Sequence, residues 1–160
     1  MNDLVPQTAF RGAMIASTAC SPALWQRSTD RRLSFADAVK DIAADPKLAS
    51  ELAQARHRLE HAAAPATREQ IATILAPMAR MYGLKDRSEA EWRTFWEFYV
   101  KALGDLPLEA IAAGADDYVE RADSEFFPKP GPLKELCRKR AEPILMALGR
   151  IRAAAKLVNA

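Results

Sequence analysis

Two histidines are the first residues whose spacing could support chemistry. His57 and His61 lie four positions apart, so on a helix both imidazoles would face the same side, as in a two-histidine metal site. The residue after His57 is an arginine, whereas H-E-x-x-H metalloproteases place a glutamate there, and three alanines follow His61. We therefore interpret both histidines as solvated residues of a charged surface helix, and we expect no metal site.

A group of carboxylates is the next candidate. Asp116, Asp117, Glu120 and Asp123 share the outer side of an expected helix, but this stretch lacks the loop and the glycine of a calcium-binding hand. The sequence also contains no glycine-rich phosphate loop and no G-x-S-x-G nucleophile turn. These observations disfavour an enzyme, and no cofactor is expected.

Basic residues near the C-terminal end indicate binding. Arg138-Lys139-Arg140 is a compact cluster that could contact phosphates or an acidic protein surface, and no aromatic residues are interleaved as in proteins that read single strands. Near the other end, Trp25 is suited to packing on a partner or back onto the body of the protein. The candidate partner contacts are Trp25, Arg138, Lys139, Arg140, Arg150 and Arg152.

The charges are unevenly distributed along the chain. The formal net charge is only +2, yet residues 1–66 carry +1, residues 67–127 carry −5 and residues 128–160 carry +6. Such blocks are typical of solvated helix faces, and they also fit a basic surface that meets an acidic partner or phosphates.

Composition indicates an all-α protein. The 160 residues are 49% hydrophobic and 28% charged, which excludes a disordered chain, while 8% aromatics and six glycines make a sheet-rich fold improbable. Cys20 and Cys137 are far apart and have no partners at metal-ligand spacing, so neither a disulfide framework nor a zinc site is indicated. No stretch is apolar enough to span a membrane and no signal peptide is evident, so we expect a cytoplasmic protein.

The first 66 residues are expected to form an arm and a helical pair. Residues 1–33 lack a clean hydrophobic period and predict an extended N-terminal arm. Residues 34–66 predict two helices and a linker, the first beginning at Ser34 with Asp37 in its first turn and the second at Pro46.

Residues 67–142 predict a bundle of four helices, and residues 143–160 a basic C-terminal helix. Capping boxes at Thr67-Gln70 and Ser88-Glu91 mark the first two helices. The stripe of Trp92, Phe95, Trp96, Tyr99 and Leu103 on the second has helical spacing and is expected to be core. A third helix begins near Pro107, and three alternate prolines keep the segment 126–132 from being helical throughout. Pro143 either kinks the fourth helix or begins a fifth.

The stretch from Thr67 to about Arg140 resembles the helical domain of the phage replicative-helicase loader/inhibitor family. In that family a helix ending in tyrosine precedes a helix with a central tryptophan, then an acidic helix ending in tyrosine, then a Phe-Pro motif that opens the last helix. The residues that carry the resemblance are Tyr82, Trp96, Tyr99, Leu103, Leu108 to Tyr118, Phe126, Phe127, Pro128, Leu133 and Leu136. Unlike the family pattern, about 66 residues precede this domain and a basic tail follows it.

The resemblance implies a non-enzymatic accessory protein of DNA replication that binds the replicative helicase and an initiator protein. Two alternatives remain open. One is a small nucleic-acid-binding or regulatory phage protein that acts through its basic C-terminal tail. The other is a structural oligomer joined through the expected helix from Pro46 to Leu59. No pattern in the sequence indicates the oligomeric state.

Overall fold

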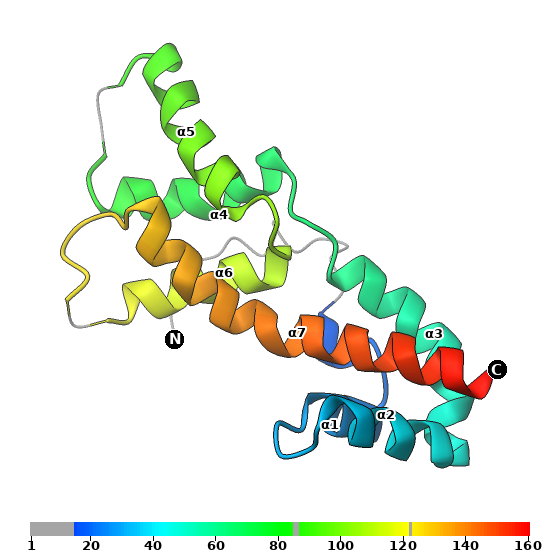
Figure 1. The fold of residues 1–160 in the computed structure, drawn as a ribbon. Helices are drawn as coiled ribbons and strands as arrows, with labels where there is room; N and C mark the ends of the chain where they lie inside the picture. Colours follow the sequence, from blue (N-terminus) through cyan, green and yellow to red (C-terminus); the bar gives the residue numbers. More distant parts are fainter. Residues whose placement is uncertain (1–14, 85–86, 122) are drawn as a thin grey trace. The chain divides into compact units, whose positions relative to one another are not determined.

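A computed structural model describes residues 15–84, 87–121 and 123–160. Seven α-helices and one 3-10 turn, and no strand, are assigned within these residues, so the expected all-α fold is confirmed. The helices are arranged in two compact units, each with its own apolar core (Figure 1). Among the described residues, one unit contains those between 64 and 141, and the other contains residues 15–63 together with 142–160.

The unit of residues 64–141 is built from α4 (Arg68–Met81), α5 (Glu89–Leu103), α6 (Leu108–Val119) and the first part of α7 (Pro130–Val158). Both predicted capping boxes are present, with the side chains of Thr67 and Ser88 each accepting from a backbone N–H three residues ahead. At the end of α4, Gly83 has φ +70, and its N–H donates to the carbonyl of Arg80. Glycine adopts this left-handed conformation without steric cost, which explains why the helix ends there.

Close helix contact organises the core of this unit. Gly114 of α6 lies so near α7 that a Cβ atom placed on it would be 2.6 Å from the Sγ of Cys137 and 2.7 Å from its Cα and N. The lack of a side chain at Gly114 therefore lets α6 approach the backbone of α7. The largest fully buried side chains around this contact are Ile71, Ile74, Leu75, Leu103, Ile111 and Leu133.

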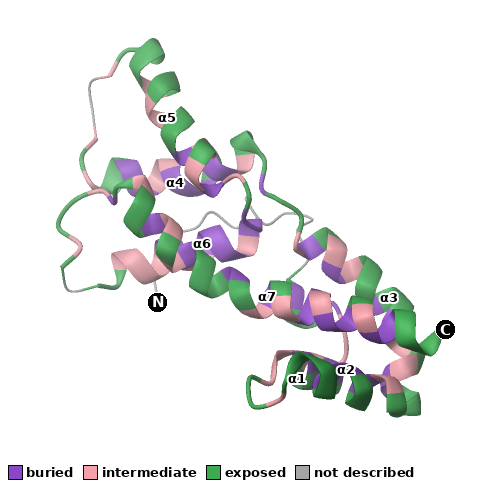
Figure 2. Ribbon diagram, in the orientation of Figure 1, coloured by how far each residue is buried: buried purple, intermediate pink, exposed green. Residues whose placement is uncertain are grey.

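The second unit is built from the 3-10 turn η2 (Ala16–Thr18), α1 (Pro22–Thr29), α2 (Phe35–Ala44), α3 (Pro46–Ala62) and the second part of α7. The expected cap of α2 is observed, because Ser34 accepts from the N–H of Asp37. Helix α3 begins at Pro46 as expected, and Asp45 caps it by accepting from the N–H groups of Lys47 and Leu48. Buried side chains from all these helices form one core, which includes Leu24, Ile42, Leu59 and Ile151 (Figure 2).

Two expectations about segments are wrong. Within the arm expected over residues 1–33, residues 22–29 form helix α1, which begins with Ser21 as its N-cap and Pro22 in its first turn. Residues 1–14 lie outside the described residues. At the other end, no separate helix begins at Pro143, since α7 is assigned without a break from Pro130 to Val158. Pro130 and Pro132 fit its first turn because the N–H groups there have no partner within the helix.

Candidate functional site

The aromatic stripe of α5 is only partly core. Tyr99 and Leu103 are buried as expected, whereas Trp92, Phe95 and Trp96 in the first half of the helix are each partly exposed. The periodicity correctly predicted the side of α5 that faces the core. The N-terminal turns of α5 extend past the other helices of this unit (Figures 1 and 2). These helices therefore do not cover the N-terminal part of the aromatic stripe.

The partly exposed aromatic rings contact one another along the helix. The ring of Phe95 lies edge-on to Trp92 at 5.5 Å and edge-on to Trp96 at 4.9 Å between ring centroids. The two indoles are stacked with centroids 5.8 Å apart and planes 15° apart. Rings that hold each other in place lose little conformational entropy on binding, so this cluster is suited to serve as a preformed contact surface.

Arg87 completes the cluster from the turn before α5. Its guanidinium carbon lies 4.4 Å from the ring centroid of Phe95 and 5.3 Å from that of Trp92, which are cation–π distances. The nearby Glu91 carboxylate accepts from the backbone N–H and the hydroxyl of Ser88, each at 2.8 Å, and it also attracts Arg87 electrostatically. The backbone hydrogen bond from Ser88 is the main reason that the pKa of Glu91 is lowered, so this carboxylate is ionised at neutral pH.

A shallow hollow of about 540 Å³ lies beside this cluster on α5. Phe95 and Phe98 contribute its apolar surface, and Phe98 is 62% exposed. The remaining lining residues are Arg87, Ala90, Glu91 and Thr94. We call the surface formed by Arg87, Ala90, Glu91, Thr94, Phe95 and Phe98 the α5 face. It combines an exposed phenylalanine with a cation held on aromatic rings.

The Phe126–Pro128 segment is a structural element that holds this unit together. The hydroxyl of Tyr99 donates to the carbonyl of Pro128 at 2.7 Å, and the hydroxyl of Tyr118 donates to the carbonyl of Phe126 at 2.8 Å. Phe127 packs against Tyr99 and Phe95 with centroids 5.4 and 5.6 Å apart. The residues of the predicted motif are thus brought together, and only the side chain of Phe126 is largely exposed, at 76%.

The basic residues of α7 mostly have acidic partners within their own unit. Arg140 pairs with Asp117 through two nitrogens, Arg138 pairs with Glu135, and Arg152 donates to Glu60 at 3.0 Å. Lys139 is exposed. The carboxylate of Asp117 therefore belongs to an ion pair, and much of the positive charge in this stretch is balanced locally.

Arg150 is a structural residue and not a surface contact. It is 4% exposed, and its guanidinium donates to the carbonyls of Ser28 at 3.3 Å, Asp30 at 2.8 Å and Leu33 at 2.8 Å. These carbonyls belong to the last turn of α1 and the loop after it, where backbone oxygens have no helical partner. The expectation that Arg150 contacts a partner is therefore wrong.

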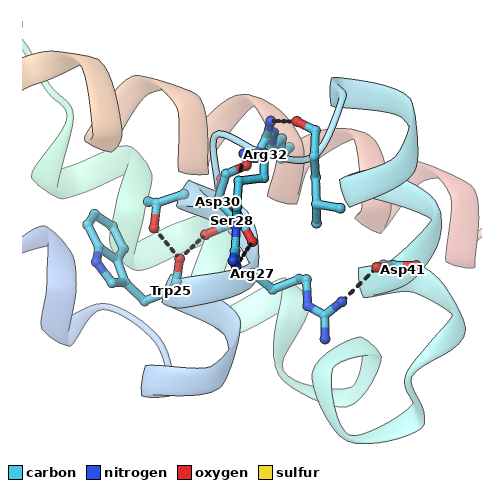
Figure 3. Close-up of polar contacts among 9 residues, drawn as sticks. Trp25, Arg27, Ser28, Asp30, Arg32 and Asp41 are labelled. Carbon is cyan, nitrogen blue, oxygen red and sulfur yellow. Dashed lines mark hydrogen bonds and ion pairs between the residues drawn. The ribbon is translucent and has the colours of Figure 1, made fainter.

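Trp25 packs back onto the body of its own unit, one of the two arrangements expected for it. Its ring lies partly buried against the core of the second unit, and its carbonyl accepts from Ser28 at 3.0 Å and Thr29 at 2.8 Å (Figure 3). In the same region Arg27 donates to Asp41 and Arg32 donates to Asp30. The hydrogen bonds from Arg32 are the main cause that lowers the pKa of Asp30 to about 2.

A pocket of about 330 Å³ beside α1 has mixed charge. It is lined by Arg27, Arg32, Asp30 and Asp45, together with Leu33, Leu48 and two α1 residues. Both arginines are paired with aspartates, and the Asp45 carboxylate caps α3. The pocket therefore presents no unbalanced charge that would select a ligand.

The histidine pair occupies the exposed side of α3. The stretch from His57 to His61 also has the H-x-x-E-H order that some metalloproteases use, a pattern that the sequence interpretation missed. Its carboxylate, Glu60, accepts from Arg152. Within the part of the chain that the structure describes, these residues do not form a group that could hold a metal ion.

Comparison with protein-family models, with characterised proteins and with solved structures finds no match to this chain. Across residues 15–84, 87–121 and 123–160, no helix combines the length and apolar character needed to cross a bilayer. The function is therefore inferred from the site itself.

Proposed function

We propose that this chain is a non-enzymatic binding protein and that the α5 face is its principal contact with a protein partner. The observation that supports the proposal is the preformed aromatic cluster at the uncovered end of α5, with Phe98 beside it at 62% exposure. Aromatic residues and arginine are enriched at the energetic centres of protein interfaces, and this surface offers both.

The partner we propose is a replicative helicase, with the chain acting as its loader or inhibitor during phage DNA replication in the cytoplasm. The resemblance to the loader family includes Trp96 and Tyr99, both on α5. A protein of this kind needs a stable scaffold and a contact surface, and no catalytic group. The small helical unit of residues 64–141 supplies the scaffold, since its core is continuous from α4 to α7.

The alternative proposal, binding of nucleic acid through the basic tail, has less support. The ion pairs of Arg138, Arg140 and Arg152 and the burial of Arg150 reduce the cations available to phosphates. Binding of arbitrary duplex that falls steeply with salt, and falls further on Lys139→Gln, would favour this alternative.

The test mixes the full chain with the replicative helicase of its host. We expect a complex in light scattering and a changed ATPase rate of the helicase. Phe98→Ala should weaken the complex about tenfold, because it removes an exposed aromatic contact without opening a core cavity. Phe35→Ala is the matched control, since Phe35 is also exposed, at 55%, but lies on α2.

Absence of any complex with the wild-type chain would reject the helicase as partner. Equal weakening by Phe98→Ala and Phe35→Ala would reject the α5 face as the contact. The sign of the change in ATPase and unwinding rates separates a loader from an inhibitor, because a loader increases productive assembly on DNA and an inhibitor reduces it.

A further inference from the structure

The second unit carries more cations than its own carboxylates balance. Its described residues, 15–63 and 142–160, include ten lysines and arginines against seven aspartates and glutamates. Four of the arginines are held in ion pairs with carboxylates, and Arg150 is buried on backbone carbonyls. Among the described residues, five cations of this unit have no ion pair, namely Lys40, Lys47, Arg56, Arg58 and Lys156.

Two of these unpaired cations flank His57 on α3. Arg56, His57 and Arg58 are consecutive residues of a helix, so their side chains leave it about 100° apart and together cover its outer half. Arg56 and His57 are exposed, and Arg58 is partly exposed. Gln54 and His61 lie about one turn to either side of His57 and are exposed as well. We call these five residues the α3 face.

The carboxylates of α3 and of its N-cap do not neutralise this face. Glu51 accepts from the backbone N–H and the hydroxyl of the α1 N-cap residue, so it is held against the start of α1. Glu60 accepts from Arg152 at 3.0 Å, and these two charges balance each other. Asp45 precedes Arg56 by 11 residues, which is about 16 Å along the helix axis. The arginines of the α3 face therefore keep their donors for an external anion.

From this distribution of charge we infer that the α3 face binds the phosphate backbone of double-stranded DNA without reading its sequence. Arg56 and Arg58 contact phosphates through their guanidinium groups, which match the geometry of phosphate oxygens. The amide of Gln54 and the imidazoles of His57 and His61 supply further N–H donors. This binding goes beyond the proposed function, because α3 and the α5 face belong to different units.

A duplex fits the α3 face better than a single strand does. Helix α3 contains no phenylalanine, tyrosine or tryptophan, whereas proteins that bind single strands stack the bases on such rings. From Gln54 to His61 the donors extend over about 10 Å of the helix axis. Duplex DNA carries about one negative charge per 1.7 Å of its length, so several phosphates lie within that distance.

A protein or a membrane fits this face less well. No large apolar side chain is exposed along Pro46–Ala62. Protein interfaces have an apolar centre, and helices that lie on a bilayer insert apolar side chains below the headgroups. Binding to a nucleic-acid backbone needs only cations and hydrogen-bond donors, which is what the α3 face offers.

The experiment titrates the full chain into a fluorescent DNA duplex of about 20 base pairs and follows anisotropy between about 25 and 200 mM salt. We expect saturable binding at low salt and the same affinity for a second duplex of unrelated sequence. Arg56→Gln combined with Arg58→Gln should weaken binding at least tenfold at about 50 mM salt. It should also reduce the slope of log K against log salt concentration by about 2, because two phosphate contacts are lost.

Two further variants serve as controls. Arg138→Gln combined with Lys139→Gln removes the same charge from an exposed stretch in the other unit, and we expect it to bind within about twofold of wild type. Arg56→Lys combined with Arg58→Lys keeps both charges and should bind within about threefold of wild type. Circular dichroism should show the same helix content for all variants, since none of these side chains is buried.

Several results would overturn the inference. No binding of duplex at about 50 mM salt would reject it outright. Equal weakening by the Arg56/Arg58 and Arg138/Lys139 glutamine variants would show that the α3 face is not the contact. Tighter binding of a poly-dT strand than of the duplex would assign the contact to single strands. Stronger binding to vesicles with about 30% phosphatidylserine than to DNA would assign the face to a membrane.

The outcome is independent of the helicase assay. Duplex binding that depends on Arg56 and Arg58, without a helicase complex, would reject the proposed partner and keep the inference. A helicase complex that depends on Phe98, together with no binding of duplex by the chain alone, would keep the proposed function and reject the inference.

Discussion

The hydroxyl of Tyr99 donates a 2.7 Å hydrogen bond to the carbonyl of Pro128, and this bond is buried. It connects α5 to the chain just before α7, although 29 residues separate the two partners. Tyr118 makes a parallel but exposed bond to the carbonyl of Phe126. The two tyrosines thus hold the backbone of the Phe126–Pro128 segment at two points.

Removing the Tyr99 hydroxyl should destabilise the protein more than removing that of Tyr118. Tyr99→Phe leaves the buried carbonyl of Pro128 without a donor, which costs about 1–3 kcal/mol in free energy of unfolding. Tyr118→Phe leaves the carbonyl of Phe126 open to water, which can replace the lost donor. We therefore expect a loss of about 0.5 kcal/mol in free energy of unfolding. Urea denaturation followed by circular dichroism measures both, and equal losses would contradict the role of burial.

The phenol of Tyr99 should ionise only at high pH. Burial is the main cause that raises its pKa from the ordinary value of 10 to about 12. Because the folded pKa is the higher one, the stabilisation is fully present below pH 10 and is lost as the pH rises through 12. Absorbance at 295 nm should show late-titrating tyrosine, and Tyr99→Phe should remove the part that Tyr99 contributes, while Tyr118, whose pKa burial also raises, keeps its own. A Tyr99 titration that is complete by pH 10.5 in the folded protein would contradict this.

Gly114→Ala should be strongly destabilising. Alanine is favoured over glycine inside a helix by about 1 kcal/mol, but the new Cβ would meet the Cα and N of Cys137 at 2.7 Å. Backbone atoms cannot rotate away, so α6 must move off α7, and we expect a net loss of about 2–3 kcal/mol. Gly131→Ala is the control in α7, since nothing lies within 4 Å of a Cβ there. The melting temperature of Gly114→Ala should therefore fall clearly below that of Gly131→Ala in thermal unfolding.

Arg150→Met should lower stability by about 2–4 kcal/mol, because the carbonyls of Ser28, Asp30 and Leu33 lose a buried charged donor. Arg152→Gln breaks only an exposed ion pair with Glu60 and should cost at most about 0.5 kcal/mol. Chemical denaturation measures the free energy of unfolding of both variants. An Arg150→Met variant as stable as wild type would show that the guanidinium is not needed to hold the loop after α1.

Both thiols should react slowly with a disulfide reagent such as DTNB at pH 8. Burial is the main cause that raises the pKa of Cys20 to about 11 and that of Cys137 to about 12, so little thiolate is present. Cys20 is partly exposed and Cys137 is buried, and Cys20 should therefore react first. Full reactivity of both thiols within the mixing time, without denaturant, would contradict the folded environment of Cys137.

The parts of the fold that could be predicted depend on hydrogen bonds between residues close in the sequence. The starts of α2, α4 and α5 were predicted because Ser34, Thr67 and Ser88 bond to residues three positions ahead. The same reasoning missed α1, whose apolar residues Leu24 and Trp25 form too short a pattern to stand out among prolines and polar residues. It also left open whether Pro143 kinks the fourth helix or begins a fifth, whereas α7 is assigned as one helix through Pro143, with buried residues both before and after the proline.

The candidate site was predicted only in part, and α5 shows why. Spacing identified the side of the helix that carries Trp92, Phe95 and Trp96, but periodicity contains no information on how far along a helix the neighbouring elements reach. For the basic residues, too, the sequence does not show which side chains become buried. Arg150 and Arg152 are two positions apart, yet one is buried against carbonyls and the other is exposed.

The sequence by itself determined the all-α class and the main helix starts, because these depend on composition and on hydrogen bonds that span three or four residues. Only the tertiary structure decided that residues 15–63 share a core with residues 142–160, that Arg150 is internal, and that one end of the α5 stripe is uncovered. Each of these depends on contacts between residues far apart in the chain, and such contacts are selected by the packing of whole helices.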